Sequence, residues 1–115
     1  MENTTRYIDV EDGLRRVRGN KTLYAKMLGM FLASKEIILL EENLASNGIA
    51  GAADVAHALR GVTGNLSLTA LFGASTDLME SLQAGNRDES IIARYRDTLE
   101  KTLAHIEDTR RQLEA

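Results

Sequence analysis

His57 is the side chain of this 115-residue sequence that could act chemically by itself. Neutral imidazole is a nucleophile near pH 7, and it needs no neighbouring base to activate it, unlike a Ser hydroxyl. The chain has one other histidine, His105, and no cysteine, so disulfides and thiolate metal sites are excluded. His57 is therefore the candidate nucleophile, and its surroundings decide whether another molecule can reach it.

The apolar pattern around His57 predicts a helix over about residues 49–66 with the imidazole facing solvent. On a helical wheel stepping about 100° per residue, Leu59, Val62 and Leu66 fall within about 40° of Val55 and define the core side. His57 falls at about 200° from Val55, almost opposite to that side.

Small residues surround His57 on this predicted solvent-facing stripe, where Lys, Glu or Arg usually stand. They are Ala50, Ala53, Gly61 and Gly64, with Asp54 and Arg60 at the flanks. Because each glycine inside a helix costs about 1 kcal/mol relative to Ala, helix stability does not explain the two glycines. A stripe without long side chains lets another protein approach the ring closely, so we expect a docking surface here. On the stripe alone, an ordinary surface histidine and a frayed helix end stay open as alternatives.

Five predicted helices position this stripe. Asp9 is the expected N-cap of a short first helix that ends before Gly19 and Asn20. A long helix with a broad apolar face follows over about 21–45, and a polar turn at 46–48 separates it from the His57 helix. Two more helices are expected over about 69–84 and 88–113.

Short turns make consecutive helices antiparallel neighbours. The predicted fold class is therefore all-α: an antiparallel up-down four-helix bundle with a short N-terminal helix across one end. We expect a single domain over residues 1–115, with residues 1–7 as a candidate disordered N-terminus.

The composition is typical of a soluble globular protein, and the absence of a signal segment and of a membrane span makes a cytoplasmic location the expected default. The chain is 43% hydrophobic and 27% charged, with a net charge of −3 and no proline. It has neither an apolar run approaching the ~18 residues of a membrane span nor an apolar N-terminal signal segment. Lys and Arg form no long run, which argues against binding to nucleic acid. We therefore expect neither a membrane nor a nucleic acid as a partner.

The segment from Ala56 to Leu66, AHALRGVTGNL, resembles the signature of histidine phosphotransfer (HPt) domains, which is roughly A-H-x-L-K-G followed by small residues and L-G. The flanking helices agree in order and spacing over residues 10–85, through Leu23, Tyr24, Leu28 and Phe31 before the motif and Leu71, Leu78, Met79 and Glu80 after it. There are two departures from the family pattern. Arg60 stands where Lys is usual, and Ser67 stands where Gly is common, so that Ser67 or Thr69 is expected to N-cap the next helix.

The resemblance implies a phosphoryl carrier in a two-component phosphorelay. His57 would accept a phosphoryl group from a receiver-domain aspartate, and Arg60 would stabilise the charge of that group. The expected partners are response-regulator receiver domains, a hybrid sensor kinase, or both, and the chain is expected to be a monomer. Mg²⁺ would come from the receiver, so no bound cofactor or metal is expected. The sequence lacks an acidic cluster for Mg²⁺ and a glycine-rich loop for ATP, which argues against autokinase activity.

Three other functions compete with this interpretation. A non-catalytic helical adaptor would never be phosphorylated on His57. The dimerisation helix pair of a sensor kinase has an acidic residue after its His and a nearby Pro, whereas Ala58 follows His57 and the chain has no Pro. A phosphatase or mutase would need a substrate pocket and further catalytic residues.

Three more residues are expected to have no special role. His105 should be a solvated surface residue, and Met27 and Met30 should belong to the core rather than to a docking surface.

Overall fold

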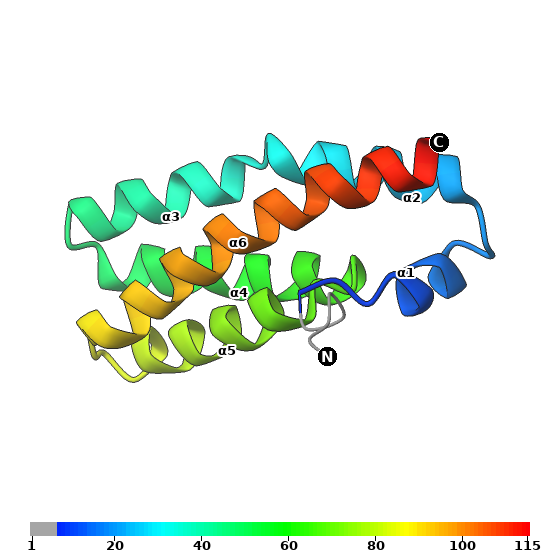
Figure 1. The fold of residues 1–115 in the computed structure, drawn as a ribbon. Helices are drawn as coiled ribbons and strands as arrows, with labels where there is room; N and C mark the ends of the chain where they lie inside the picture. The colour runs from blue at the N-terminus through cyan, green and yellow to red at the C-terminus, as the bar shows by residue number, and fades with distance from the viewer. Residues whose placement is uncertain (1–6) are drawn as a thin grey trace.

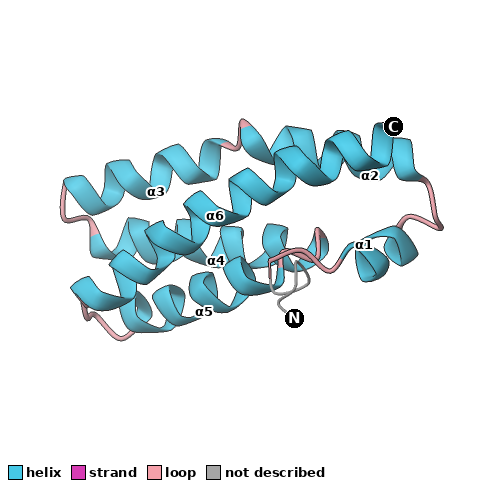
Figure 2. Ribbon diagram, viewed as in Figure 1, coloured by secondary structure: helices cyan, strands magenta, loops and turns pink. Residues whose placement is uncertain are grey.

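The structure is a computed structural model that describes residues 7–115. It contains six helices: α1 (Val10–Arg16), α2 (Lys21–Leu32), α3 (Lys35–Ala45), α4 (Ile49–Asn65), α5 (Thr69–Gln83) and α6 (Glu89–Glu114). Figure 2 shows that short loops join them, and no strand occurs among residues 7–115. The all-α prediction is confirmed. The predicted disordered segment 1–7 lies outside the described residues except for Tyr7, which is ordered against His105.

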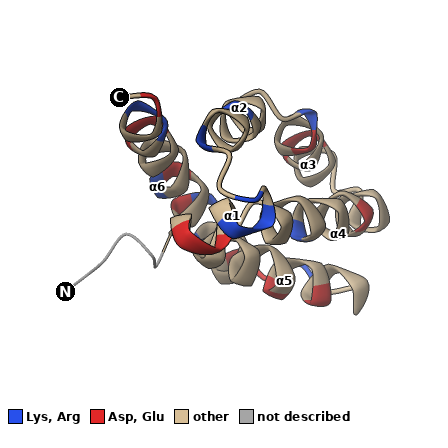
Figure 3. Ribbon diagram, turned by 90° about the vertical axis from the view of Figure 1, so that its right-hand side faces the viewer, with Lys and Arg blue, Asp and Glu red and all other residues tan. Residues whose placement is uncertain are grey.

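The longer helices pack lengthwise around a shared apolar core. In Figure 1, α2 and α3 follow one another along one side, α6 runs beside them, and α4 and α5 lie next to each other on the opposite side. The contacts between helices agree: α4 packs on α3 and α5, and α6 packs on α2 and α5. Figure 3 shows α1 lying across the end of the other helices. Since α4 contacts helices on two of its sides, these contacts control which way its residues face.

The predicted single helix over 21–45 is wrong, because the chain breaks at Ala33 and Ser34 into α2 and α3. The buried stripe of α2 contains Tyr24, Leu28 and Phe31. Continued at helical spacing, that stripe would point Lys35 and Glu42 into the core. Ser34 instead has extended backbone angles, and its hydroxyl donates to the carboxylate of Glu36 at 2.9 Å. The break changes the phase of the second segment, so that Leu40 and Leu44 are buried there.

Helix α1 is attached to the rest of the molecule through Tyr24 of α2, whose ring packs on Gly13 of α1. The hydroxyl of Tyr24 donates to the carbonyl oxygen of Leu66 at 2.8 Å, and the ring is 1% exposed. A Cβ atom at Gly13 of α1 would lie 2.2 Å from Cζ of Tyr24. Any larger residue at position 13 would therefore push the ring from its place or push α1 off the end of the molecule.

The turn between α4 and α5 is held by hydrogen bonds between Ser67 and the start of α1. Ser67 has φ 60°, a left-handed conformation that favours glycine. Its carbonyl accepts the N–H of Asp9 at 2.9 Å, and its hydroxyl donates to the carboxylate of Asp12 at 2.6 Å. The N-cap prediction is wrong for both Ser67 and Thr69, since Leu68 occupies the N-cap position of α5. The Ser67 hydroxyl is instead used to tie the turn to α1.

Substitution of Gly13 by Ala is expected to lower the free energy of unfolding by about 1–3 kcal/mol, the usual cost of overpacking a filled core. The Tyr24 ring is buried and hydrogen-bonded, so it cannot turn away from the added methyl group. Chemical denaturation would measure the change. Gly73→Ala is the control, because a Cβ at that helical glycine meets open space and should be neutral or stabilising. Equal stability of Gly13→Ala and the parent would contradict this packing.

Acid should loosen the attachment of α1 through Asp12. Hydrogen bonds from Ser67, Arg16 and Arg15 hold the pKa of the Asp12 carboxyl well below its usual value of 3.8. Its contribution to stability is therefore present above about pH 4 and is lost as the pH falls further, towards the folded-state pKa. Asp12→Asn should be less stable than the parent at pH 7, and the difference should narrow between pH 5 and pH 2. A constant difference over that range, measured by thermal unfolding, would show that Asp12 contributes no charge-dependent stability.

Candidate functional site

His57 lies on α4 with its side chain exposed, as the helical wheel predicted. The ring is not free in solvent, however. Its Nδ1 atom lies 3.2 Å from Sδ of Met79, which comes from α5 and is only 9% exposed. The imidazole therefore sits at the edge where α4 meets α5, with one ring nitrogen against a buried thioether.

Helix α4 is rotated relative to the prediction. Its buried side is Ala52, Ala53, Ala56, Leu59 and Thr63, whereas Val55 and Val62 are only half-buried. At about 100° per residue, the centre of the buried side lies about 90° from Val55, towards His57. The small residues Ala52 and Ala56 carry no strong signal in an apolar pattern, while the two valines at the edge of the helix do. This rotation moves His57 from the middle of the exposed face to its α5 side.

The rotation corrects two of the predicted docking residues. Ala53 is buried, 7% exposed, and does not belong to the open surface. Gly64 is half-buried beneath Phe72 of α5, and a Cβ there would lie 3.1 Å from a ring carbon. Gly64 is small because Phe72 of α5 packs closely over it, and Ala53 falls within about 20° of Gly64 on the helical wheel, so both belong to a packed side of α4 rather than to a docking surface.

The remaining docking residues do surround an open surface. Ala50, Asp54 and Gly61 are exposed, and so is Ala58, which the sequence reasoning left out. A Cβ at Gly61 would meet open space. Asp54 and Arg60 are the charged residues of α4, and the end view in Figure 3 shows how little of this helix is charged. We call Ala50, Asp54, Ala58 and Gly61 the open face of α4.

Arg60 is held along α5. Its Nε donates to Oγ1 of Thr76 at 3.1 Å, and its guanidinium carbon lies 5.0 Å from the centre of the Phe72 ring. A cation over an aromatic face is a favourable contact, typically worth about 0.5–1 kcal/mol when partly exposed.

The α5 residues that contact the two candidate side chains, His57 and Arg60, were not predicted from the sequence. Phe72, Thr76 and Met79 are spaced at i, i+4 and i+7, one residue beyond the buried line of Leu71, Ser75, Leu78 and Leu82. That spacing alone places them on one edge of α5. What the sequence did not show is that this edge faces His57 and Arg60. We call Phe72, Thr76 and Met79 the α5 edge.

Two further expectations need correction. His105 is not a solvated surface residue: it is half-buried, and its ring stacks on Tyr7 with centroids 4.6 Å apart. Met30 is 66% exposed and does not belong to the core. Met27 is half-buried and packs against the core. Both methionines line a largely apolar hollow between α2 and α4, together with Phe31, Val62 and Leu66.

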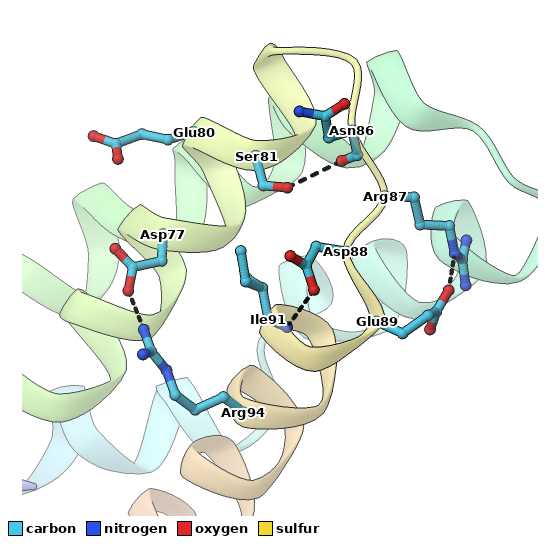
Figure 4. Close-up of a pocket in the computed structure, with 9 residues that line it drawn as sticks. All are labelled: Asp77, Glu80, Ser81, Asn86, Arg87, Asp88, Glu89, Ile91 and Arg94. Carbon is cyan, nitrogen blue, oxygen red and sulfur yellow. Dashed lines mark hydrogen bonds and ion pairs between the residues drawn. The ribbon is translucent and has the colours of Figure 1, made fainter.

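A polar hollow of about 900 Å³ lies at the turn between α5 and α6, shown in Figure 4. Its charged groups largely satisfy one another. Arg94 pairs with Asp77, Arg87 pairs with Glu89 at 2.7 Å, and Asp88 caps its own helix. Glu80 points away from these groups in Figure 4. These groups are surface ion pairs and a helix cap that hold the turn between α5 and α6 in place.

Within residues 7–115, His, Asp and Glu side chains form no group of three or more that could hold a metal ion. None of the helices described there is long and apolar enough to cross a membrane.

The chain matches no protein-family model, and no curated protein or solved structure is found to be similar to it. The resemblance to HPt domains therefore depends on the residues of the motif and of its flanking segments, and on their spacing in the sequence.

The two glycines near His57 should respond differently to substitution. Gly61→Ala is expected to stabilise the protein by about 0.5–1 kcal/mol, because the methyl group meets open space and Ala is the better helix former. Gly64→Ala should gain less or lose stability, because Phe72 must move by a few tenths of an ångström. Thermal unfolding of the two variants would measure the difference. Equal stabilisation would mean that Phe72 does not restrict Gly64.

Proposed function

We propose that this chain is a histidine-containing phosphotransfer protein that shuttles a phosphoryl group between His57 and the aspartates of receiver domains. The observation that carries the proposal is an exposed imidazole, inside an HPt-like motif, on a helix face cleared of long side chains. A phosphoryl carrier needs this arrangement, because the donor must bring its own active site to within bonding distance of the ring.

The transfer needs few groups from this chain. A ring nitrogen of His57 attacks the phosphorus atom of an aspartyl phosphate; the N–P bond forms as the acyl O–P bond breaks, and the aspartate leaves as a carboxylate. The reverse reaction delivers the group to another receiver. Phosphoryl transfer depends mostly on positioning and on charge stabilisation, so a nucleophile and one nearby cation are sufficient on the carrier side.

Arg60 is the proposed cation. It lies one helical turn from His57, and its contacts with Thr76 and Phe72 keep it on the same side of α4. The new dianionic group on His57 offers Arg60 a hydrogen bond in which both partners are charged, which is stronger than the bond to the uncharged hydroxyl of Thr76. We therefore propose that Arg60 turns from the α5 edge towards the phosphoryl group when His57 is loaded.

The architecture proposed for this function is an antiparallel up-down four-helix bundle. The α2–α3 segment would form one arm, α4, α5 and α6 the other three, and α1 would cover one end. The short connections and the side-by-side packing of these helices support this arrangement. A rigid bundle suits a carrier, because it holds His57 in one place while partners exchange.

The proposed partners are response-regulator receiver domains and a hybrid sensor kinase in the cytoplasm, with Mg²⁺ supplied by the receiver. The chain is proposed to act as a monomer and to lack autokinase activity.

A second candidate function is a helical adaptor that binds such domains without being phosphorylated. The exposed Met30, Leu23 and Ile38 favour it, because large apolar side chains on a surface often mark contacts with other proteins. Phosphate on the chain separates the two functions, since an adaptor would bind receivers but carry none.

His57→Gln is expected to abolish acceptance of phosphate from receivers charged with acetyl phosphate, a loss of at least about 100-fold for removal of the nucleophile. The side chain is exposed, so helicity and melting temperature should change little. The measurement is acid-labile, alkali-stable phosphate on this chain.

His105→Gln is the matched control. It removes the stack on Tyr7 and should cost about 0.5–1.5 kcal/mol of stability. Transfer should nevertheless stay at the parental rate. Label that persists in His57→Gln, or that disappears in His105→Gln, would contradict the site.

A further inference from the structure

The two ring nitrogens of His57 have different surroundings. Nδ1 lies 3.2 Å from Sδ of Met79. A thioether can accept a hydrogen bond but has no proton to donate, and a neutral imidazole carries one N–H and one lone pair. A favourable contact between Nδ1 and Sδ therefore requires the proton to be on Nδ1. The lone pair then belongs to Nε2, on the opposite edge of the ring.

We propose that Met79 is a positioning residue for His57: its sulfur accepts the Nδ1–H bond, selects that tautomer, and leaves Nε2 as the nitrogen that takes the phosphoryl group. The choice of Nε2 as the phosphorylated nitrogen rests on the proposed phosphotransfer function. The tautomer of His57 in the unloaded protein does not depend on that function and can be measured by itself. Met79 touches neither substrate nor the reacting nitrogen, and it acts through the imidazole.

The surroundings of Met79 suit this role. Met79 is 9% exposed and belongs to the apolar core, so its sulfur is held in place by packing. It belongs to the α5 edge, where Thr76 fixes Arg60 in the same way. One edge of α5 thus orients both of the side chains that α4 contributes to the site.

The selected tautomer simplifies the chemistry. Nε2 carries no proton, so its lone pair can attack phosphorus without a base to deprotonate it. As the N–P bond forms and the O–P bond of the donor breaks, positive charge develops on the ring and is shared with Nδ1. The Nδ1–H group becomes a stronger donor at that stage. Its hydrogen bond to sulfur is therefore stronger in the transition state than in the unloaded protein.

The first test is the tautomer of His57 in the unloaded parent at a pH where the ring is neutral, read from nitrogen-15 NMR of the imidazole. Histidine in water favours the Nε2–H form, so the two possibilities differ clearly. We expect the Nδ1–H form to predominate in the parent. In Met79→Leu, which keeps the apolar volume but has no acceptor, the ring should return to the Nε2–H form. Met27→Leu is the matched control and should leave His57 unchanged.

The second test uses phosphoramidate, a small phosphoryl donor, and therefore needs no receiver domain. The parent should be phosphorylated on Nε2, whereas Met79→Leu should give a mixture of the Nδ1 and Nε2 isomers, resolved by phosphorus NMR. Loading of Met79→Leu from a receiver should be slower by about two- to tenfold, the range expected for one hydrogen bond.

The outcomes separate the two proposals. An Nε2–H tautomer in the parent, or an unchanged tautomer and isomer ratio in Met79→Leu, would overturn the role of Met79 whether or not receivers load the chain. The parental measurement stands even if the variant folds poorly. An Nδ1–H tautomer in a parent that no receiver loads would support the positioning by Met79 and contradict the phosphotransfer function.

Discussion

The close packing of α4 on α5 is the constraint on which the rest of the site depends. Helices approach closely only where small side chains leave room, and Gly64 of α4 lies directly beneath Phe72 of α5, with Ala53 on the same side of the helix. This contact sets the rotation of α4 about its axis. The rotation in turn brings His57 to the border between the helices, where the sulfur of Met79 can reach its ring. A larger residue at position 53 or 64 would therefore disturb the orientation of the imidazole as well as the core.

The small residues around His57 have two explanations rather than one. Gly64 is covered by the Phe72 ring, which restricts its size, whereas a Cβ at Gly61 on the open face meets open space. The sequence alone does not separate the two groups, because a glycine looks the same in either place. Only the neighbour above it, Phe72 for Gly64 and solvent for Gly61, distinguishes them.

Much of the fold could be predicted from the sequence because helical spacing and turn residues are local signals. The helices over 49–65, 69–83 and 89–114 lie within a few residues of their expected bounds. The break at Ser34 could not be predicted, since both halves of the expected helix are apolar and only their phase relative to the core differs. The exposure of His57 followed from the wheel, but its place at the α5 border did not. The contacts of Arg60 and Met79 also depend on which edge of α5 faces α4, which is a tertiary property.

The left-handed conformation of Ser67 has a consequence for the order of folding. A non-glycine residue in that conformation costs on the order of 1 kcal/mol, and the hydrogen bond from its hydroxyl to Asp12 offsets this cost. That bond joins residues 55 positions apart, so it closes a long loop and should form late. Before this hydrogen bond forms, nothing offsets the cost of the left-handed conformation in the turn that joins α4 and α5. Amide hydrogen exchange would then find α1 and this turn opening together as one unit, ahead of the helices that carry His57 and Met79.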